Sequence, residues 1–187
     1  MPIVGVDLDS VLADLSGAFI REWNTAYPRT PIDRPYWDCC DLHEKLGISK
    51  SHFHKIMNRA WGAYPSMETQ EPEEDIHLAL KRLRRAGCAV WIVSNRHISS
   101  HWGVACWLAL KKIEYDVLIL NHEGPDKMAY PIDCLVDDNP KEAGKVREGK
   151  RLYLRDQACI RDGGDVEGKV MRVWTLGEAV KRVVEGL

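Results

Sequence analysis

Short apolar runs alternate with helix-like segments through most of this chain, and that alternation restricts the possible folds more than any other feature. The first run, Ile3 to Val6, leads into Asp7. Five further runs follow at 88–93, 117–120, 132–136, 152–154 and 170–174. Strands that alternate with helices form mainly parallel sheets. We therefore expect an α/β fold with a Rossmann-like, mainly parallel sheet flanked by helices.

Two of the intervening segments carry an apolar stripe at helical spacing. In the segment that begins after Pro72, the stripe is Ile76, Ala79, Leu80 and Leu83. The last segment opens with a capping box from Thr175 to Glu178. We expect its stripe to be buried, and this stripe is Leu176, Ala179, Val180, Val183 and Val184. A third helix is expected from about 100 to 111, and a short one after Pro140.

Residues 28–72 differ in character from the rest of the chain. Five prolines interrupt this segment, and it is rich in aromatic residues. Residues 11–27 are predicted to form an amphipathic helix or a loop that enters one, and a second helix is predicted at about 49–61. We expect a small helical cap at 16–72, inserted after the first strand, with the core formed by 1–15 and 73–187.

Composition argues against several classes of partner. The net charge of −2 provides no strong field for a nucleic-acid polymer or a membrane surface. No run approaches the ~20 apolar residues of a membrane span, and the opening run lacks the basic lead of a signal peptide. The six cysteines form no Cys-x-x-Cys pair. We therefore expect reduced cysteines in a cytoplasmic protein, and the sequence leaves a homodimer open.

Three of the predicted strands end in pairs of polar residues. These pairs are Asp7 and Asp9, Ser94 and Asn95, and Asp137 and Asp138. Side chains alternate along a strand, so Asp7 and Asp9 share one face while Leu8 takes the other. Ligands of open parallel sheets bind beyond the carboxyl ends of the strands. We therefore expect the three pairs to converge on one edge of the sheet.

Neighbouring carboxylates without an adjacent base indicate a bound cation, and oxygen ligands favour a hard ion such as Mg²⁺. The candidate metal ligands are Asp7, Asp9, Asp137 and Asp138. A phosphate monoester is a dianion that repels an attacking anion, so its hydrolysis needs positive charge around the transferred oxygens. Lys127 would add to the charge of the metal. The Ser94 hydroxyl, Asn95 and backbone N–H groups are candidates for binding the phosphoryl oxygens.

The order of these groups resembles that of the haloacid dehalogenase (HAD) superfamily: Asp7-Leu8-Asp9, then Ser94, Lys127 and Asp137-Asp138. The resemblance covers about 1–15 and 73–187. It implies that Asp7 is a nucleophile that forms an aspartyl-phosphate. It also implies that Asp9 protonates the leaving oxygen and then deprotonates the attacking water.

The same resemblance assigns the remaining groups. Asp9 would offer the metal its backbone carbonyl, while Ser94 and Lys127 would bind phosphate. Asp138 is favoured over Asp137 as the direct metal ligand, although sequence alone does not separate the two.

A closer resemblance within that superfamily is to the 5'(3')-deoxyribonucleotidases. It rests on Asp-x-Asp-x-Val-x-Ala-Asp at 7–14, on Asp126-Lys127 followed by Leu-Val-Asp-Asp at 135–138, and on the helical insertion. Ser10 stands where those enzymes usually have glycine, and Asn139 stands where arginine is expected. The resemblance implies a Mg²⁺-dependent phosphomonoesterase that acts on nucleoside monophosphates, in particular deoxynucleoside monophosphates.

The predicted cap holds eight of the 15 aromatic residues. Nucleobases stack on aromatic faces at about 1–3 kcal/mol per base, so one interpretation is a nucleotide pocket beneath the cap, with Trp37 and Trp61 as candidates. The other interpretation is that a small cap needs aromatic residues for its own core.

Two alternative functions use similar groups. A phosphatase of a sugar phosphate or another small metabolite phosphate would keep the mechanism and change the leaving group. A receiver-type signalling module also holds Mg²⁺ and phosphate with strand-end aspartates, a hydroxyl residue and a lysine. In receivers the phosphoacceptor lies mid-chain and the lysine comes last. Here Asp-x-Asp leads and an acid pair follows the lysine, which favours the enzyme.

Overall fold

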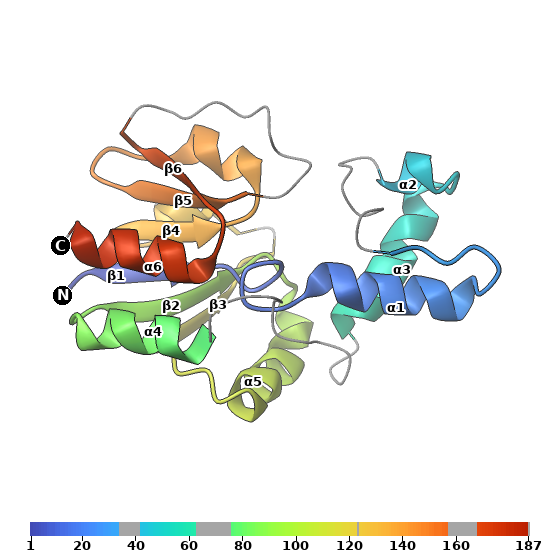
Figure 1. Ribbon diagram of the computed structural model, residues 1–187, viewed down its shortest axis with the longest axis horizontal. Helices are drawn as coiled ribbons and strands as arrows, with labels where there is room; N and C mark the ends of the chain where they lie inside the picture. Colours follow the sequence, from blue (N-terminus) through green and yellow to red (C-terminus); the bar gives the residue numbers. More distant parts are fainter. Residues whose placement is uncertain (34–41, 63–75, 123, 157–167, 187) are drawn as a thin grey trace.

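A six-stranded parallel sheet forms the centre of the computed structural model (Figure 1). The structure describes residues 1–33, 42–62, 76–122, 124–156 and 168–186, without the side chains of 61 and 62. The strands are β1 (Ile3–Val6), β2 (Ala89–Ser94), β3 (Val117–Leu120), β4 (Cys134–Asp137), β5 (Arg151–Arg155) and β6 (Val170–Val173). They lie in the order β3-β2-β1-β4-β5-β6, and every neighbouring pair is parallel. The predicted α/β fold is confirmed.

One face of the sheet packs against the long helices of the core. These helices are α4 (Ile76–Arg85), α5 (His101–Leu110) and α6 (Leu176–Glu185). Alternate strand residues, including Val4, Val6, Val90 and Ile92, join them in the main hydrophobic cluster. The predicted apolar stripe of α4 is buried at all four positions. Each large apolar side chain buried in this way contributes roughly 1.5–3 kcal/mol of transfer free energy.

Helix α6 is capped as the sequence predicts, with one change of partner. The Thr175 hydroxyl accepts a hydrogen bond from the Glu178 N–H at 3.1 Å. The Glu178 carboxylate reaches one residue further back and accepts from the Trp174 N–H at 2.9 Å. The prediction that Val184 is buried is wrong, since 38% of it is exposed. Val184 lies in the last turn of α6, at the end of the stripe, where coverage by the neighbouring elements stops.

The opposite face of the sheet packs against short segments. Two 3₁₀ helices, η4 (Lys127–Ala129) and η5 (Pro140–Lys145), lie on this side. Met128 of η4 is fully buried, and it packs with Leu135 and Leu152 of the strands in a separate cluster. Both 3₁₀ helices belong to loops that also carry candidate site residues. The packing of this face is therefore directly connected to the site.

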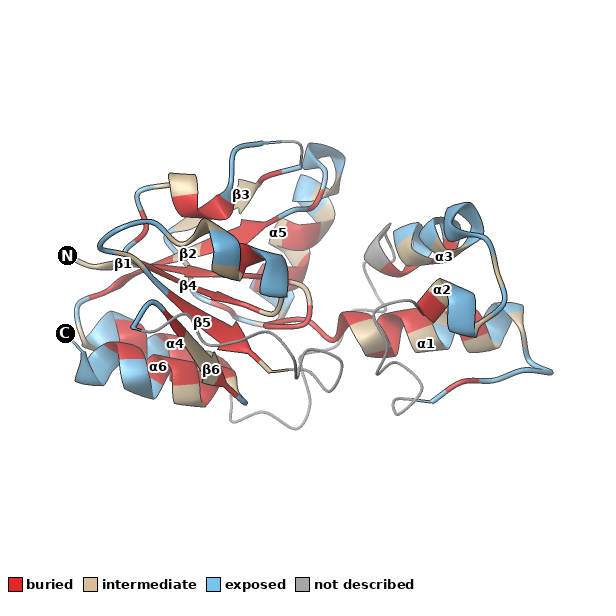
Figure 2. Cartoon of the chain, turned by 90° about the horizontal axis from the view of Figure 1, so that it is seen from above, coloured by how far each residue is buried: buried red, intermediate tan, exposed pale blue. Residues whose placement is uncertain are grey.

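Three helices form a second unit beside the sheet, α1 (Leu15–Ala26), α2 (Leu42–Lys45) and α3 (Lys50–Gly62) (Figures 1 and 2). Their buried residues make a cluster separate from those of the sheet. The helix predicted at about 49–61 is confirmed by α3, and within 11–27 a loop leads into α1. The cap bounds of 16–72 stay a prediction, because 34–41 and 63–75 lie outside the described residues.

Aromatic side chains of α1 and α3 pack on one another. The ring centroid of Phe19 lies 5.0 Å from that of Phe53 and 6.3 Å from that of Trp23. Phe19 and Trp23 are buried, so these two residues serve the core of the helical unit. Trp37 lies outside the described residues, and Trp61 lies in α3 with its side chain not described. Their contact with a nucleobase stays a prediction.

The described cysteines are free thiols. Cys88 and Cys134 are buried, and Cys106 is half-buried. Burial raises the pKa of the Cys134 thiol to about 12, which suits a small apolar core residue. The other three cysteines lie outside the described residues. The cytoplasmic location and the homodimer stay predictions.

No helix in the described part of the chain is both long and apolar enough to span a membrane.

Candidate active site

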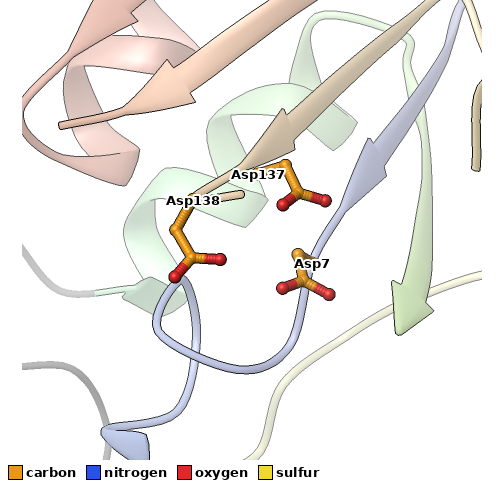
Figure 3. Close-up of side chains that lie close together, drawn as sticks. All are labelled: Asp7, Asp137 and Asp138. Carbon is orange, nitrogen blue, oxygen red and sulfur yellow. The ribbon is translucent and has the colours of Figure 1, made fainter. Parts of the chain in front are cut away.

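Three carboxylates meet at the carboxyl ends of the two central strands (Figure 3). Asp7 follows β1, Asp137 is the last residue of β4, and Asp138 follows it. The strands are neighbours, with Val6 opposite Val136. One carboxylate oxygen of each aspartate lies within 4.8 Å of the other two. The convergence of these side chains gives a group of oxygen atoms close enough to share one cation.

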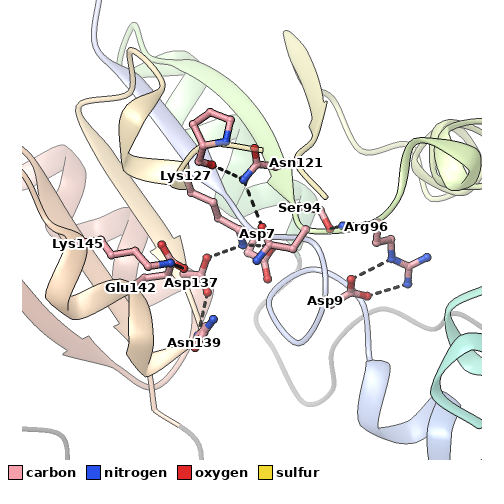
Figure 4. A network of polar contacts seen from close by, with 12 residues as sticks. Asp7, Asp9, Ser94, Arg96, Asn121, Lys127, Asp137, Asn139, Glu142 and Lys145 are labelled. Atoms are coloured by element: carbon pink, nitrogen blue, oxygen red, sulfur yellow. Dashed lines mark hydrogen bonds and ion pairs between the residues drawn. The ribbon is translucent and has the colours of Figure 1, made fainter. Parts of the chain in front are cut away.

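Lys127 lies between two of these carboxylates (Figure 4). Its Nζ donates to Asp7 Oδ1 and to Asp137 Oδ2, both at 2.7 Å. Only 2% of Lys127 is exposed, so its charge is held by these acids and not by bulk water. The second oxygen of Asp137 accepts from the Asn139 N–H at 2.8 Å. Both oxygens of Asp137 are therefore engaged by donors of the chain.

Burial and repulsion shift the pKa values of this group. Burial, followed by repulsion from Asp137, raises the pKa of Asp138 to about 7. Burial also raises the pKa of Asp7 well above its usual value, although Lys127 opposes this effect. For Lys127, burial disfavours the ammonium, but attraction to Asp7 and Asp137 outweighs it and raises the pKa.

The residues present fit a divalent cation. The raised pKa values of Asp7 and Asp138 show that the site disfavours ionised carboxylates. A divalent cation would supply positive charge that stabilises the ionised carboxylates. The donors that lie together are carboxylate oxygens, which suit Mg²⁺ better than a soft transition metal.

Replacement of Lys127 by methionine is expected to reduce the free energy of unfolding by about 3–5 kcal/mol at pH 8, since it leaves buried carboxylates without their counter-charge. The loss should be smaller at pH 5, where carboxyls with raised pKa values take up protons instead. Urea unfolding at the two pH values measures both quantities. Lys181→Met, at an exposed pair with Glu185, is the control and should change stability by less than about 1 kcal/mol. Equal losses for the two variants would contradict this account.

Strand β2, which pairs with β1 in the sheet, positions the candidate phosphate-binding residues. Ser94 is the last residue of β2 and is 1% exposed, whereas Asn95 is exposed. The Ser94 carbonyl accepts from the Asn121 N–H at 2.6 Å. The Asn121 amide donates to the Pro125 carbonyl at 2.7 Å and lies 3.4 Å from Asn95 Oδ1. Asn121 therefore ties the loop before Lys127 to the end of β2.

The sequence reasoning missed Asn121. It directly follows β3, and its amide oxygen accepts from the Tyr130 hydroxyl at 2.7 Å. The strand-end rule that selected Asp7 and Ser94 would also have selected this residue. It was overlooked because a single amide after a strand is a weak signal without its partners.

Asp9 does not join the carboxylate cluster. Its two oxygens accept from Arg96, at 2.9 Å from Nε and at 2.7 Å from Nη2 (Figure 4). Arg96 is 3% exposed. The structure places the Asp9 side chain on the Arg96 guanidinium, so any contact of Asp9 with a metal would come through its backbone.

The turn after Asp9 shows why glycine suits the next position. Ser10 has φ of +62°, a left-handed conformation that favours glycine. The N–H groups of Leu12 and Ala13 both donate to the Leu8 carbonyl, at 3.0 and 2.8 Å. The Arg155 guanidinium donates to the Ser10 carbonyl. The chain thus tolerates serine here within a closely hydrogen-bonded turn.

Asp14, the last residue of the resemblance motif, caps α1. Its carboxylate accepts from the Gly17 N–H and from the Ser16 hydroxyl, both at 3.0 Å. Such caps contribute about 1 kcal/mol to helix stability. These two contacts of Asp14 stabilise the start of α1, directly after the turn that follows Asp9.

Comparison with known proteins identifies the fold. No protein-family model matches the sequence, and no curated protein matches it significantly. A haloacid dehalogenase-like hydrolase from Streptococcus pneumoniae has a TM-score of 0.66 at 13% identity, over 98% of each chain. The L-2-haloacid dehalogenase from Xanthobacter autotrophicus, with chloropropionic acid covalently bound, has a TM-score of 0.60 at 14% identity over 100% of each chain. A HAD phosphatase from Thermococcus onnurineus has a TM-score of 0.57 at 17% identity over 98% of each chain.

The chain has the haloacid dehalogenase-like fold. The fold that the resemblance to the HAD superfamily implies is confirmed. The closer resemblance to the deoxyribonucleotidases stays a prediction.

Proposed function

We propose that the protein is a Mg²⁺-dependent phosphomonoesterase of the HAD superfamily, with Asp7 as its nucleophile. The observation that carries the proposal is the Lys127 ammonium between Asp7 and Asp137, beside Asp138 at the strand ends. Positive charge beside the nucleophile reduces its repulsion of a phosphate dianion. A HAD phosphatase is among the solved structures of the same fold, which supports this choice of reaction.

The proposed reaction has two steps. In the first, an Asp7 oxygen attacks phosphorus, the bond from phosphorus to the leaving oxygen breaks, and Asp9 gives that oxygen its proton. In the second, a water oxygen attacks phosphorus, Asp9 takes a proton from the water, and the bond from phosphorus to Asp7 breaks. Inorganic phosphate leaves and Asp7 is restored. Mg²⁺, when bound, supplies positive charge to the transferred oxygens.

The other residues bind and orient the groups that react. The Ser94 hydroxyl, the Asn95 amide and Lys127 are proposed to hold the phosphoryl oxygens. Asp138 is proposed as a direct metal ligand, because Asp137 already accepts hydrogen bonds at both oxygens. Asp7 would contribute its carboxylate to the same ion, and Asp9 its backbone carbonyl.

The proposed substrates are nucleoside monophosphates, in particular those of deoxynucleosides. This choice rests on the 7–14 motif and on the helical unit after β1. The second candidate is a sugar phosphate or other small metabolite phosphate. The burial of Phe19 and Trp23 within the helical unit favours testing it, because these two rings are taken up by packing and do not offer a stacking surface for a base.

Phosphate release from a substrate panel tests the proposal. Purified protein with Mg²⁺ should release phosphate from at least one deoxynucleoside monophosphate, and faster than from hexose phosphates or glycerol phosphate. Preference for a sugar phosphate would reject the nucleotide assignment and retain the reaction. Release from none of the panel, in protein shown to be folded, would reject the phosphatase proposal.

A further inference from the structure

A bidentate ion pair lies beside the proposed nucleophile and outside the carboxylate cluster. Arg96 donates through Nε to Asp9 Oδ2 at 2.9 Å and through Nη2 to Asp9 Oδ1 at 2.7 Å. The Arg96 side chain is 3% exposed and that of Asp9 is 14% exposed. The two residues are 87 positions apart in sequence. The contact therefore depends on the fold and not on local sequence.

The planar guanidinium of Arg96 fixes the orientation of the Asp9 carboxylate as well as its distance. Two parallel hydrogen bonds hold both oxygens of a carboxylate in one plane, whereas an ammonium would act as a single point of charge. The terminal torsion of aspartate is otherwise broad. Arg96 thus restricts the rotation of the Asp9 carboxylate, which must come within about 2.6–3.2 Å of any oxygen to which it gives a proton.

Arg96 also contacts the residue proposed to bind phosphate. Its backbone N–H donates to Ser94 Oγ at 3.3 Å. One residue is therefore hydrogen-bonded to both proposed partners of the reacting ester: Ser94 on the phosphoryl side and Asp9 on the leaving-group side. This arrangement would keep the proton donor in register with the phosphoryl group.

We propose that Arg96 is a positioning residue that orients the Asp9 carboxylate toward the leaving oxygen. The inference rests on the proposed phosphatase function. Its effect falls on the step in which the bond from phosphorus to the leaving oxygen breaks while the Asp7 oxygen bonds to phosphorus. Before that step Asp9 holds its proton on an oxygen lone pair that does not accept from Arg96, and the electron pair left on the leaving oxygen then takes this proton. An alkoxide needs this proton, whereas a nitrophenolate is stable without it.

The test compares two leaving groups in single turnovers with enzyme in excess over substrate. Release of the leaving group is followed for p-nitrophenyl phosphate and for the best alkyl phosphate of the panel, because later hydrolysis at Asp7 is common to both. Arg96→Ala should slow alkyl release by about 10²-fold and nitrophenol release by less than about threefold, given the 10²–10⁴-fold typical of acid–base catalysis. Arg96→Lys keeps the positive charge but cannot make the two parallel hydrogen bonds, and should slow release from the alkyl ester by about tenfold.

A double-mutant cycle separates positioning from direct phosphate binding. If Arg96 acts through Asp9, adding Arg96→Ala to Asp9→Asn should cause no further loss with the alkyl ester. The inference would be overturned if the losses of Asp9→Asn and Arg96→Ala multiplied in the double variant. It would also be overturned if Arg96→Ala slowed release of the two leaving groups equally, or made release faster. Arg84→Ala removes a partly exposed arginine–aspartate pair with Asp116 and serves as the control for general effects.

The outcomes also distinguish this inference from the proposed function. A wild-type protein that releases neither leaving group would overturn both. If the wild type is active but the Arg96 variants do not lose more activity with the alkyl ester than with p-nitrophenyl phosphate, only the role of Arg96 would be overturned. Thermal unfolding of each variant accompanies the kinetics. If Arg96→Ala does not fold, the leaving-group ratio of Arg96→Lys decides, and a ratio unchanged from wild type overturns the proposal.

Discussion

Asp7→Asn is expected to lower turnover of the best phosphate ester by about 10⁴-fold or more, because removal of a covalent nucleophile leaves only binding and charge stabilisation. The substituted amide keeps the size of the side chain and an oxygen that can accept from Lys127. It cannot form the proposed aspartyl-phosphate. Initial rates of phosphate release at saturating substrate and Mg²⁺ measure the effect.

The stability of the same variant separates lost chemistry from lost structure. Burial raises the pKa of Asp7, so the fold disfavours its ionised form, and a neutral amide should be at least as stable as wild type at pH 8 without metal. Asp116→Asn is the matched control. Asp116 precedes β3 at the opposite end of the sheet, and its carboxylate accepts from the Val90 N–H. Near-normal turnover by folded Asp7→Asn would reject Asp7 as nucleophile.

Removal of divalent metal is expected to abolish activity, and Mg²⁺ should stabilise the fold more at pH 8 than at pH 5. The reason lies in Asp138, whose pKa rises from 3.8 to about 7. A carboxyl with a raised pKa binds its proton more tightly when folded, so it stabilises the metal-free fold at low pH. That contribution is lost as pH rises through about 7, and amounts to a few kcal/mol at about 1.4 kcal/mol per pKa unit.

Mg²⁺ reverses this dependence because it binds the ionised carboxylates. Thermal unfolding at pH 5 and pH 8, with and without Mg²⁺, measures the effect, and a phosphate-release assay in EDTA tests the need for metal. Asp138→Asn should show a weaker Mg²⁺ response than wild type and a flatter pH dependence. Stabilisation by Mg²⁺ that is equal at both pH values, or absent, would contradict a metal site at the three carboxylates.

The strand-end residues were the part of the site that sequence could predict. Each apolar run gives the position of a strand, and a parallel sheet brings the ends of its strands to one edge. This is enough to place Asp7, Ser94 and Asp137 at the same edge before any coordinates are known. The confirmed fold and the observed carboxylate cluster follow from that rule.

Side-chain pairing was beyond the sequence. The reach of Arg96 to Asp9 depends on the path of two turns after neighbouring strands, and neither turn has a periodic pattern. The same reason applies to Asn121, whose side-chain partners lie in the loop after β2 and in the connection between β3 and β4. Val184 shows a different limit, because a stripe of apolar residues does not indicate where coverage by the neighbouring helix ends.

The face of the sheet that packs against η4 and η5 has a consequence for how this protein can vary. Lys127 and Met128 are consecutive in η4, and the first supplies the ammonium of the site while the second fills the interior beneath it. A smaller residue at Met128 would open a void under a single turn of chain, and the described segments on this face include no long helix that could absorb the shift. A change of packing on this side would therefore shift the Lys127 ammonium as well. We expect substitutions in this cluster and in the site to be coupled during evolution.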